Sequence, residues 1–572
     1  MNVEAEPDYA DAVTRSSRLR KLPTNSGSER RKPFRRDWPS DIKRFERYLF
    51  PRGEFLNFFN IVCLSGVISF LLIGRQIYQA DWGLIDDHEI FSFLGPGLHL
   101  PLGDIWNTLL TKTEVGTLAG RFRPGYYVAI LIETSLLGAN VHLWYLLNAI
   151  SFSMFLSSIW WFMRRFVGTW LSGALTAYIS LLPLWAGVWS RLGPSEIYGA
   201  ACIGVVVFAA YFIFFAEAAR ARNAGAVVLT LATITLIGMK ETFVPLAGDV
   251  AAVLVLAGIQ RKLSPLLIGL LVLVIFGSAG GIVLVVRRLV LATGADFYAN
   301  PVGIWPTLQF GGSGLHTAVK RTWPLWVLSI AVLGALNVIW RKPLGSWIVA
   351  SPIAAGAYGF LVLTYAGQCA LYRSDFPLDM RYDFPAMLLV PLTCCILTCD
   401  FFYKIRPSFS QRTIDYAQLL AASVLLLYLA SGYAFLGKGK PLSAAVRANI
   451  EATNLFYNEL QLALHAAKES PESPIILEAY GPGAYEPVYS LSTYLSVLGA
   501  RNRISVRLHP GEKTLGKLYD GLEQALSVLQ EAGTGVFAPL RDSLADHPER
   551  CVSIGINGLP DAGCSGFQIR TP

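Results

Sequence analysis

The chain has 572 residues, of which 53% are hydrophobic and only 15% are charged, and its net charge is +8. An ordinary soluble domain has about 25% charged residues. This composition excludes a soluble enzyme, a disordered chain and a fibrous protein, and it favours a membrane protein that crosses the bilayer several times and carries polar appendages.

The N-terminal segment, residues 1–54, is polar and basic. Between Arg15 and Arg52 it contains 13 Lys/Arg against 4 Asp/Glu, directly before the first apolar run. Such a charge excess is typical of the cytosolic side of a membrane protein, where it also meets anionic lipid headgroups. We therefore expect a cytosolic tail that sets the topology, with membrane lipids and no nucleic acid as partners of the positive charge.

Apolar runs dominate residues 55–436, and each run that crosses ~30 Å of hydrocarbon needs ~20 residues. The stretch 125–139 is apolar but short and contains Glu133, so we expect it to lie at the outer interface or to re-enter the membrane. Eleven membrane-spanning helices are predicted, over 55–73, 142–163, 168–189, 197–217, 223–239, 241–259, 264–286, 323–340, 344–366, 383–402 and 414–435.

The basic residues predict the orientation of these spans. With the N-terminus inside, every cytosolic loop is basic, as the positive-inside rule requires. Residues 437–572 then lie outside, because the number of spans is odd. The basic residues of the cytosolic loops are Arg164, Arg165, Arg220, Arg222, Arg261, Lys262, Arg341, Lys342, Lys404, Arg406 and Arg412.

Residues 437–572 have a different pattern, with more charge and shorter apolar runs. Runs of strand character alternate with a helical pattern at 512–532, which predicts a small extracytoplasmic α/β domain. Cys551 and Cys564 are its only cysteines, and outside the cytosol they are candidates for a disulfide. The runs of strand character are 474–479, 503–508, 535–540 and 551–556.

The predicted outer loop 74–141 contains a dense ionisable group, Asp86, Asp87, His88 and Glu89. Two adjacent carboxylates repel each other, so one keeps a raised pKa unless a cation neutralises them. Such a pair suits a general base, a divalent metal site for Mg or Mn, or both. The alternative is an exposed acidic loop without a function.

Further polar groups fall in the other predicted outer turns. An arginine fork binds phosphate, although it can equally extend to lipid headgroups or form a local ion pair. Together, acidic and basic groups on one side of the membrane could hold a lipid-linked phosphate and activate a hydroxyl. These further groups are Arg123, Arg191 with Glu196, Lys240 with Glu241, and Arg381 with Tyr382.

The order and spacing of these groups resemble the GT-C superfamily of membrane glycosyltransferases, which contains protein O-mannosyltransferases and lipid A aminoarabinose transferases. The resemblance covers residues 55–405. The chain departs from the family pattern at Glu196, where many relatives carry Asp, and at Pro124, where a Pro-Pro pair is usual. The matching positions are Asp86, Asp87 and Glu89, then Arg191, Pro194 and Glu196, then Lys240 and Glu241, and last Arg381, Tyr382 and Pro385.

The resemblance implies a transferase that moves a sugar, with inversion, from a polyprenyl-phosphate donor to a glycan, lipid or protein acceptor on the outer face of the inner (plasma) membrane. We expect Asp87 as first choice for the catalytic base, with Asp86 and Glu196 as further catalytic candidates, and a metal, if there is one, at the same three carboxylates. The donor-phosphate candidates are Arg381, Lys240, Arg123 and Arg191, and the supporting residues are His88, Glu89, Glu241 and Tyr382.

Two alternatives stay open. A transporter or flippase for a polyprenyl lipid would place polar residues in the middle of the bilayer and show an internal repeat, and the sequence shows neither. A non-catalytic membrane subunit with an outer binding domain would explain residues 437–572 but not the charged turns. Convergence of Asp87, Glu196, Lys240 and Arg381 on one outer cavity would favour the enzyme, and scatter over separate surfaces would favour the alternatives.

Overall fold

The computed structural model describes residues 54–84, 86–95, 97–117, 121–293, 303–339, 352–372, 381–431, 441–469, 471–472, 475–480, 485–508, 537–539, 551–555 and 567–570. They belong to one compact unit, Tyr48–Pro572. The predicted tail up to residue 53, the predicted helix 512–532 and Cys564 lie outside the described residues.

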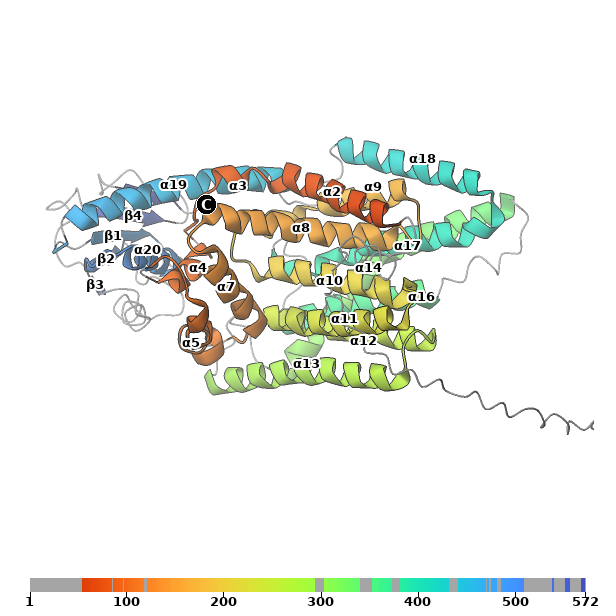
Figure 1. Ribbon diagram of the computed structural model, residues 1–572, viewed down its shortest axis with the longest axis horizontal. Coiled ribbons are helices and arrows are strands. Elements are labelled where there is room, and N and C mark those ends of the chain that lie inside the picture. Colours follow the sequence, from red (N-terminus) through yellow and green to blue (C-terminus); the bar gives the residue numbers. More distant parts are fainter. Residues whose placement is uncertain are drawn as a thin grey trace, which may run out of the picture. The chain divides into compact units, whose positions relative to one another are not determined.

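Ten helices in the described part of the chain are long and apolar enough to cross a membrane, some of them together with an adjoining 3-10 turn. They lie side by side in Figure 1. The chain is therefore an α-helical membrane protein with several spans. The ten helices are α2 (Glu54–Ile73), α8 (Val141–Met163), α10 (Ser195–Phe215), α11 (Ala219–Met239), α12 (Leu246–Ile259), α13 (Pro265–Thr293), α14 (Ile304–Ile339), α16 (Pro352–Tyr372), α17 (Leu389–Ile405) and α18 (Gln411–Ala430).

One predicted span, 168–189, is not a full spanning helix. Helix α9 (Thr169–Ser180) has 12 residues, which extend ~18 Å at 1.5 Å per residue and cannot cross ~30 Å of hydrocarbon alone. Pro183 lacks an N–H and disfavours a helical residue before it, so the chain continues as the 3-10 turn η2 (Pro183–Gly187).

The boundaries of two later helices also differ from the prediction. Helix α14 begins at Ile304, well before the predicted residue 323, and α16 covers Pro352–Tyr372 where 344–366 was predicted. The apolar pattern of α14 is interrupted by His316, Lys320 and Arg321. The first half of this helix was therefore not predicted from the sequence.

The predicted outer loop consists of short helices. Helix α7 has 14 residues and packs against α4, α5 and α11. Its length, ~21 Å, agrees with the prediction that 125–139 does not cross the membrane. The short elements are α3 (Gln76–Gln79), α4 (Asp87–Leu94), η1 (Leu102–Asp104), α5 (Ile105–Lys112), α6 (Glu114–Thr117) and α7 (Pro124–Leu137).

The C-terminal region contains helix α19 (Leu442–Glu469) and a parallel sheet with the strand order β3-β2-β1-β4-β5. Four strands overlap the four predicted runs, and β5 was not predicted. Parallel neighbours need a crossover, and α20 (Tyr485–Val497) provides it between β1 and β2. The strands are β1 (Ile475–Tyr480), β2 (Ile504–Leu508), β3 (Phe537–Pro539), β4 (Cys551–Gly555) and β5 (Phe567–Arg570).

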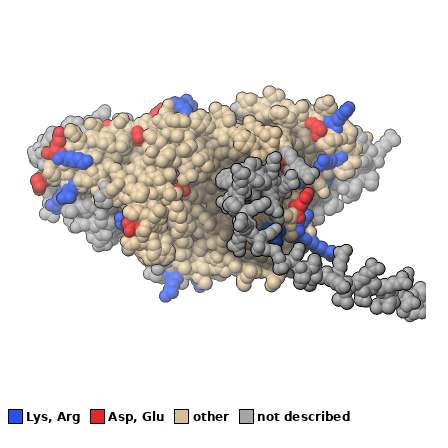
Figure 2. All heavy atoms as spheres, viewed as in Figure 1, with Lys and Arg blue, Asp and Glu red and all other residues tan. Residues whose placement is uncertain are grey.

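Polar contacts mark two ends of the helical bundle. At one end, Arg165 after α8 pairs with Glu54 of α2 at 2.8 Å, and Arg222 donates to the backbone carbonyl of Lys262. At the other end, the segment after α2 donates hydrogen bonds to backbone carbonyls of the residues that precede α8 and α10. In Figure 2 the charged side chains of the visible bundle surface lie mainly near its ends, outside the atoms drawn in grey. This pattern is that of a bundle whose middle faces lipid.

Candidate functional site

The centre of the candidate site is the carboxylate of Asp86. Its Oδ2 accepts hydrogen bonds from Arg381 Nη1 at 2.7 Å and from Arg191 Nη1 at 3.1 Å. These residues come from three segments far apart in the chain: the residue before α4, the 3-10 turn η4 (Arg381–Asp383) and the loop between η2 and α10. The side chains are 19% exposed for Asp86 and Arg381 and 40% for Arg191, so both guanidinium groups are partly accessible to solvent.

The local backbone explains how Asp86 reaches the two arginines. Asp86 has φ +69° and ψ −45°, a sparsely populated conformation for a residue with a Cβ. Gly193, with φ +84°, faces it, and a Cβ at Gly193 would lie 2.9 Å from the Cβ of Asp86. Glycine is therefore required for the close approach of this loop to Asp86.

The charges fix the protonation state of Asp86. Burial alone would raise the pKa of its carboxyl, but Arg381 and Arg191 outweigh this effect and hold the pKa at about 2. Asp86 is therefore an anion at any ordinary pH, and in this arrangement it is a weak base.

Asp87, the first choice for the base in the sequence prediction, faces inward. It is 2% exposed, its Oδ2 accepts the Gly83 N–H at 2.7 Å, and its Oδ1 has no hydrogen-bond partner among the described residues. Burial raises the pKa of Asp87 to about 7, although the hydrogen bond from Gly83 acts in the opposite direction and lowers it. A pKa near 7 would suit a general base, but the carboxylate is almost completely covered by protein.

His88 is also buried, and burial lowers its pKa, so the imidazole is neutral. Its ring packs edge-on against Tyr489 of α20, with 5.3 Å between the centroids. This contact makes His88 part of the packing between α4 and α20.

Glu196 and Lys240 form a buried ion pair of 2.6 Å between the start of α10 and the end of α11. The Lys240 Nζ lies 4.7 Å from the ring centroid of Tyr382 and 5.4 Å from that of Tyr372. Tyr382 also lies against the Arg381 guanidinium, 5.2 Å from centroid to Cζ. The predicted residues Lys240, Glu196 and Tyr382 are therefore neighbours of the Asp86–Arg381 pair, but Glu196 and Lys240 neutralise each other.

Glu89 and Arg123 belong to an adjacent cluster. Arg123 pairs with Glu114 at 2.9 Å and lies 3.9 Å from Glu89. Tyr127 donates to Glu89 at 2.6 Å, and Tyr126 donates both to Glu89 and to the Gly193 carbonyl. Arg123 thus has an internal partner, whereas Tyr126 links this cluster to the loop that faces Asp86.

The structure therefore brings together Asp86, Arg191, Arg381, Tyr382 and the Glu196–Lys240 pair. Asp87, His88, Glu89 and Arg123 surround this group, and Glu241 has a buried Oε2 without a hydrogen-bond partner among the described residues. Sequence reasoning missed Tyr126, Tyr372 and Gly193. The Gly-Pro dipeptide at 193–194 is a turn signal that could have drawn attention to the last of these.

The predicted metal ligands do not fit a metal ion as they are placed. Asp86 is held by two arginines, Glu196 by Lys240, and the one bonded oxygen of Asp87 by Gly83. Within the described ranges, no three His, Cys, Asp or Glu residues form a group that could hold a metal ion. We therefore derive no step through a metal.

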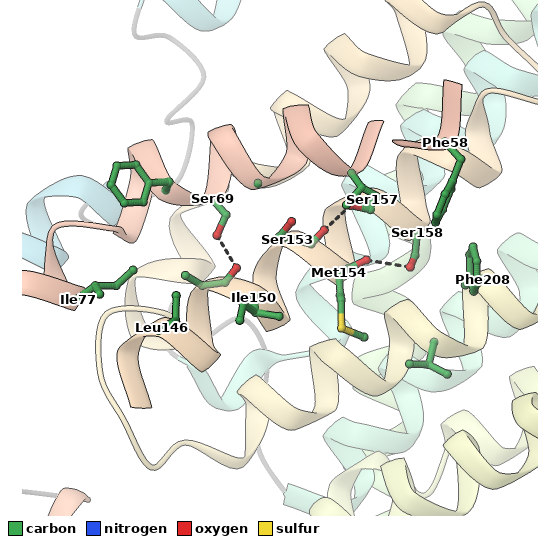
Figure 3. A pocket seen from close by; sticks show the side chains of 15 residues that line it. Phe58, Ser69, Ile77, Leu146, Ile150, Ser153, Met154, Ser157, Ser158 and Phe208 are labelled. Carbon is green, nitrogen blue, oxygen red and sulfur yellow. Dashed lines mark hydrogen bonds between the residues drawn. The ribbon is translucent and has the colours of Figure 1, made fainter. Parts of the chain in front are cut away.

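An apolar cavity of about 500 Å³ lies between α2, α8 and α10 (Figure 3). Ile77 lies near one end of it, Phe58 and Phe208 near the other, and Ser69 and Ser153 between them. The charged residues of the candidate site do not line it, so this cavity is separate from the site.

Comparison with known proteins adds no assignment. No protein-family model matches the chain, and no curated protein matches it significantly.

Proposed function

We propose that this protein is a GT-C-type membrane glycosyltransferase that moves a sugar from a polyprenyl-phosphate donor to an acceptor hydroxyl. The observation that carries the proposal is the contact of the ionised Asp86 with two partly exposed arginines, Arg381 and Arg191, at one end of an apolar helical bundle. A guanidinium fork binds phosphate with the same geometry as carboxylate. The phosphate of a polyprenyl lipid reaches this end of the bundle when the polyprenyl chain lies in the bilayer.

The proposed reaction is a single displacement. The acceptor oxygen attacks the anomeric carbon while the bond from this carbon to the phosphate oxygen breaks. Asp86 takes the proton of the acceptor hydroxyl, and the polyprenyl phosphate leaves with its charge held by Arg381 and Arg191. The configuration at the anomeric carbon inverts.

The shared arginines link donor binding to the strength of the base. In the free protein, Arg381 and Arg191 hold the pKa of Asp86 at about 2. A donor phosphate competes for the same guanidinium groups, and Asp86 loses hydrogen bonds that stabilise its charged form. Its pKa then rises, so Asp86 becomes a stronger base when the donor is in place. Asp86 therefore replaces Asp87, the first choice from sequence, in this proposal.

We further propose that the site and residues 437–572 lie on the extracytoplasmic side of the inner (plasma) membrane, as the positive-inside rule favours. The Glu196–Lys240 pair lies behind the arginines and, with Tyr382, holds Arg381 in position. A glycan, a lipid and a protein are all suitable acceptors for this chemistry, and a divalent metal is to be tested by chelation.

The test uses purified protein with a panel of polyprenyl-phosphate sugars, and the release of polyprenyl phosphate is measured with and without EDTA. We expect Asp86→Asn to reduce turnover about 10²–10⁴-fold, the range of general base catalysis. Asp87→Asn is the matched control, because its amide oxygen still accepts the Gly83 N–H, and we expect it to keep most of the activity.

Loss of activity in Asp87→Asn with full activity in Asp86→Asn would reverse the two roles. A wild-type protein that turns over none of the donors but moves polyprenyl lipid between leaflets of vesicles would favour the transporter alternative.

A further inference from the structure

We propose that helices α19 and α20 of the C-terminal region are a positioning device for the proposed base, because they hold Asp81 and Gly83 and thereby the backbone that presents Asp86 to the two arginines. This inference rests on the proposed function of Asp86. The inference gives the C-terminal region a part in the reaction. None of the described residues of that region contacts the Asp86 carboxylate, so this part is indirect.

The loop is held from both sides at one residue, Gly83. Gly83 donates its N–H to Asp87 at 2.7 Å and accepts a hydrogen bond from the Tyr494 hydroxyl of α20 at 2.7 Å on its carbonyl. The N–H of Asp81 donates to Thr453 Oγ1 of α19 at 3.2 Å. Three hydrogen bonds thus fix the segment before Asp86, and two of them come from the C-terminal region.

Aromatic packing joins the same elements. The fully buried Tyr494 ring lies 4.5 Å from Phe91 of α4 and 5.2 Å from Phe456 of α19, measured between centroids. His88 packs edge-on against Tyr489, five residues before Tyr494 on α20. The helix that begins directly after Asp86 therefore shares a core with α19 and α20, so its position depends on them.

The backbone of Asp86 explains why such support is needed. Its φ of +69° is unfavourable for a residue with a Cβ, and conformations of this kind persist only where the surrounding structure enforces them. Without the support, the loop relaxes toward ordinary dihedral angles and the carboxylate moves away from Arg381 and Arg191. Misplacement of a reacting group by about 1 Å can reduce the rate ~10²-fold.

The experiment removes, one at a time, the two hydrogen bonds that the C-terminal region makes to the loop, with little change in side-chain shape. Tyr494→Phe deletes the hydroxyl that reaches Gly83 and keeps the ring, and Thr453→Val deletes the hydroxyl that reaches Asp81. Thr453→Ser restores the hydroxyl as the conservative variant. Thr493→Val is the matched control, since the Thr493 hydroxyl donates to the Tyr489 carbonyl within α20 itself. Hydrogen exchange of the amides of 81–91 and the steady-state kinetics of donor turnover are measured for each.

We expect faster exchange over 81–91 in Tyr494→Phe and Thr453→Val, with kcat reduced about ten- to a hundredfold and the KM for the donor little changed. Thr453→Ser and Thr493→Val should behave as wild type. Unchanged exchange in both hydroxyl-deleting variants overturns the inference, and so does faster exchange with a normal kcat. If wild-type protein turns over no donor, the proposed function fails. Exchange then still decides whether α19 and α20 hold the loop.

Discussion

At the scale of single residues, the site depends on two arginines that share one carboxylate. Arg381 gives the shorter hydrogen bond to Asp86 and also lies against the Tyr382 ring, whereas Arg191 is more exposed. The planar fork of Arg381 can keep Tyr382 and bind a phosphate at the same time. A lysine cannot satisfy this geometry, because its ammonium is a compact point charge.

We therefore predict that Arg381→Ala reduces kcat/KM for the donor about 10²-fold, as expected when one donor to a developing anion is lost, and that Arg381→Lys recovers only part of this loss. Arg191→Lys should be milder, because Arg191 is the more exposed partner. Turnover of the preferred polyprenyl-phosphate sugar measures all three variants. Equal donor kinetics in wild type and Arg381→Ala would remove Arg381 from the phosphate site.

Asp87 gives a prediction on stability and pH. Burial raises its pKa to about 7 in the folded protein, whereas an unperturbed aspartate has a pKa near ~3.9. The folded state therefore binds more protons than the unfolded state between these two values. The contribution of Asp87 to stability is present at low pH and is lost as the pH rises toward 7.

Asp87→Asn is neutral at every pH and lacks this loss. We predict that the thermal midpoint of the variant rises relative to that of wild type between pH 5 and pH 7, and that the difference then levels off. Unfolding scans in detergent at several pH values measure it. A difference that does not depend on pH would show that Asp87 is ionised throughout.

At the scale of elements, the Glu196–Lys240 pair joins the start of α10 to the end of α11, and both side chains are almost fully buried. Breaking a buried pair leaves a charge without compensation, which costs about 3–5 kcal/mol, whereas replacing both partners by neutral groups is often nearly neutral. The pair therefore makes the junction of these two helices sensitive to any single change.

We predict that Glu196→Gln and Lys240→Met each lower the thermal midpoint strongly, and that the double variant is more stable than either single one. A double-mutant cycle on the midpoints measures the coupling. Additive losses would indicate that water reaches the pair and screens it.

The elements also show what the sequence could and could not predict. Most spanning helices were predictable because a run of ~20 apolar residues in a chain of this composition fits little besides a membrane span. Helix α9 was overestimated because hydropathy does not register the break at Pro183, and the first half of α14 was missed because Lys320 and Arg321 look like a loop. The residue types of the site could be predicted from local clusters of charged residues. Which of these residues pair could not, because Asp86 and Arg381 are 295 residues apart and only the packing of the fold brings them into contact.

At the scale of the whole molecule, the site and the basic loops lie at different ends of the bundle. The segment 169–187 joins these ends, since Arg165 before it pairs with Glu54 and Arg191 after it pairs with Asp86. With this segment added to the ten long apolar helices of the described residues, eleven passes run from the start of α2 to the C-terminal region. An odd number of passes places that region at the end where α2 finishes, in agreement with the contact of α19 with the loop after α2 through Thr453 and Asp81. Which end faces the cytosol follows only from the basic residues.

The last prediction tests this orientation with one cysteine at a time added to the wild-type chain at an exposed position. Thr111 lies on α5 near the site end, and Glu217 lies in the basic loop between α10 and α11. The reagent is a membrane-impermeant maleimide, applied to intact cells whose outer envelope is permeable to small molecules. It should label Thr111→Cys in these cells, and it should label Glu217→Cys only after the inner membrane is permeabilised. The wild-type protein, with its eight cysteines, gives the background. Labelling in the reverse order would place Asp86 in the cytosol and exclude an outward-facing transferase, since the acceptor would then have to be a cytosolic molecule.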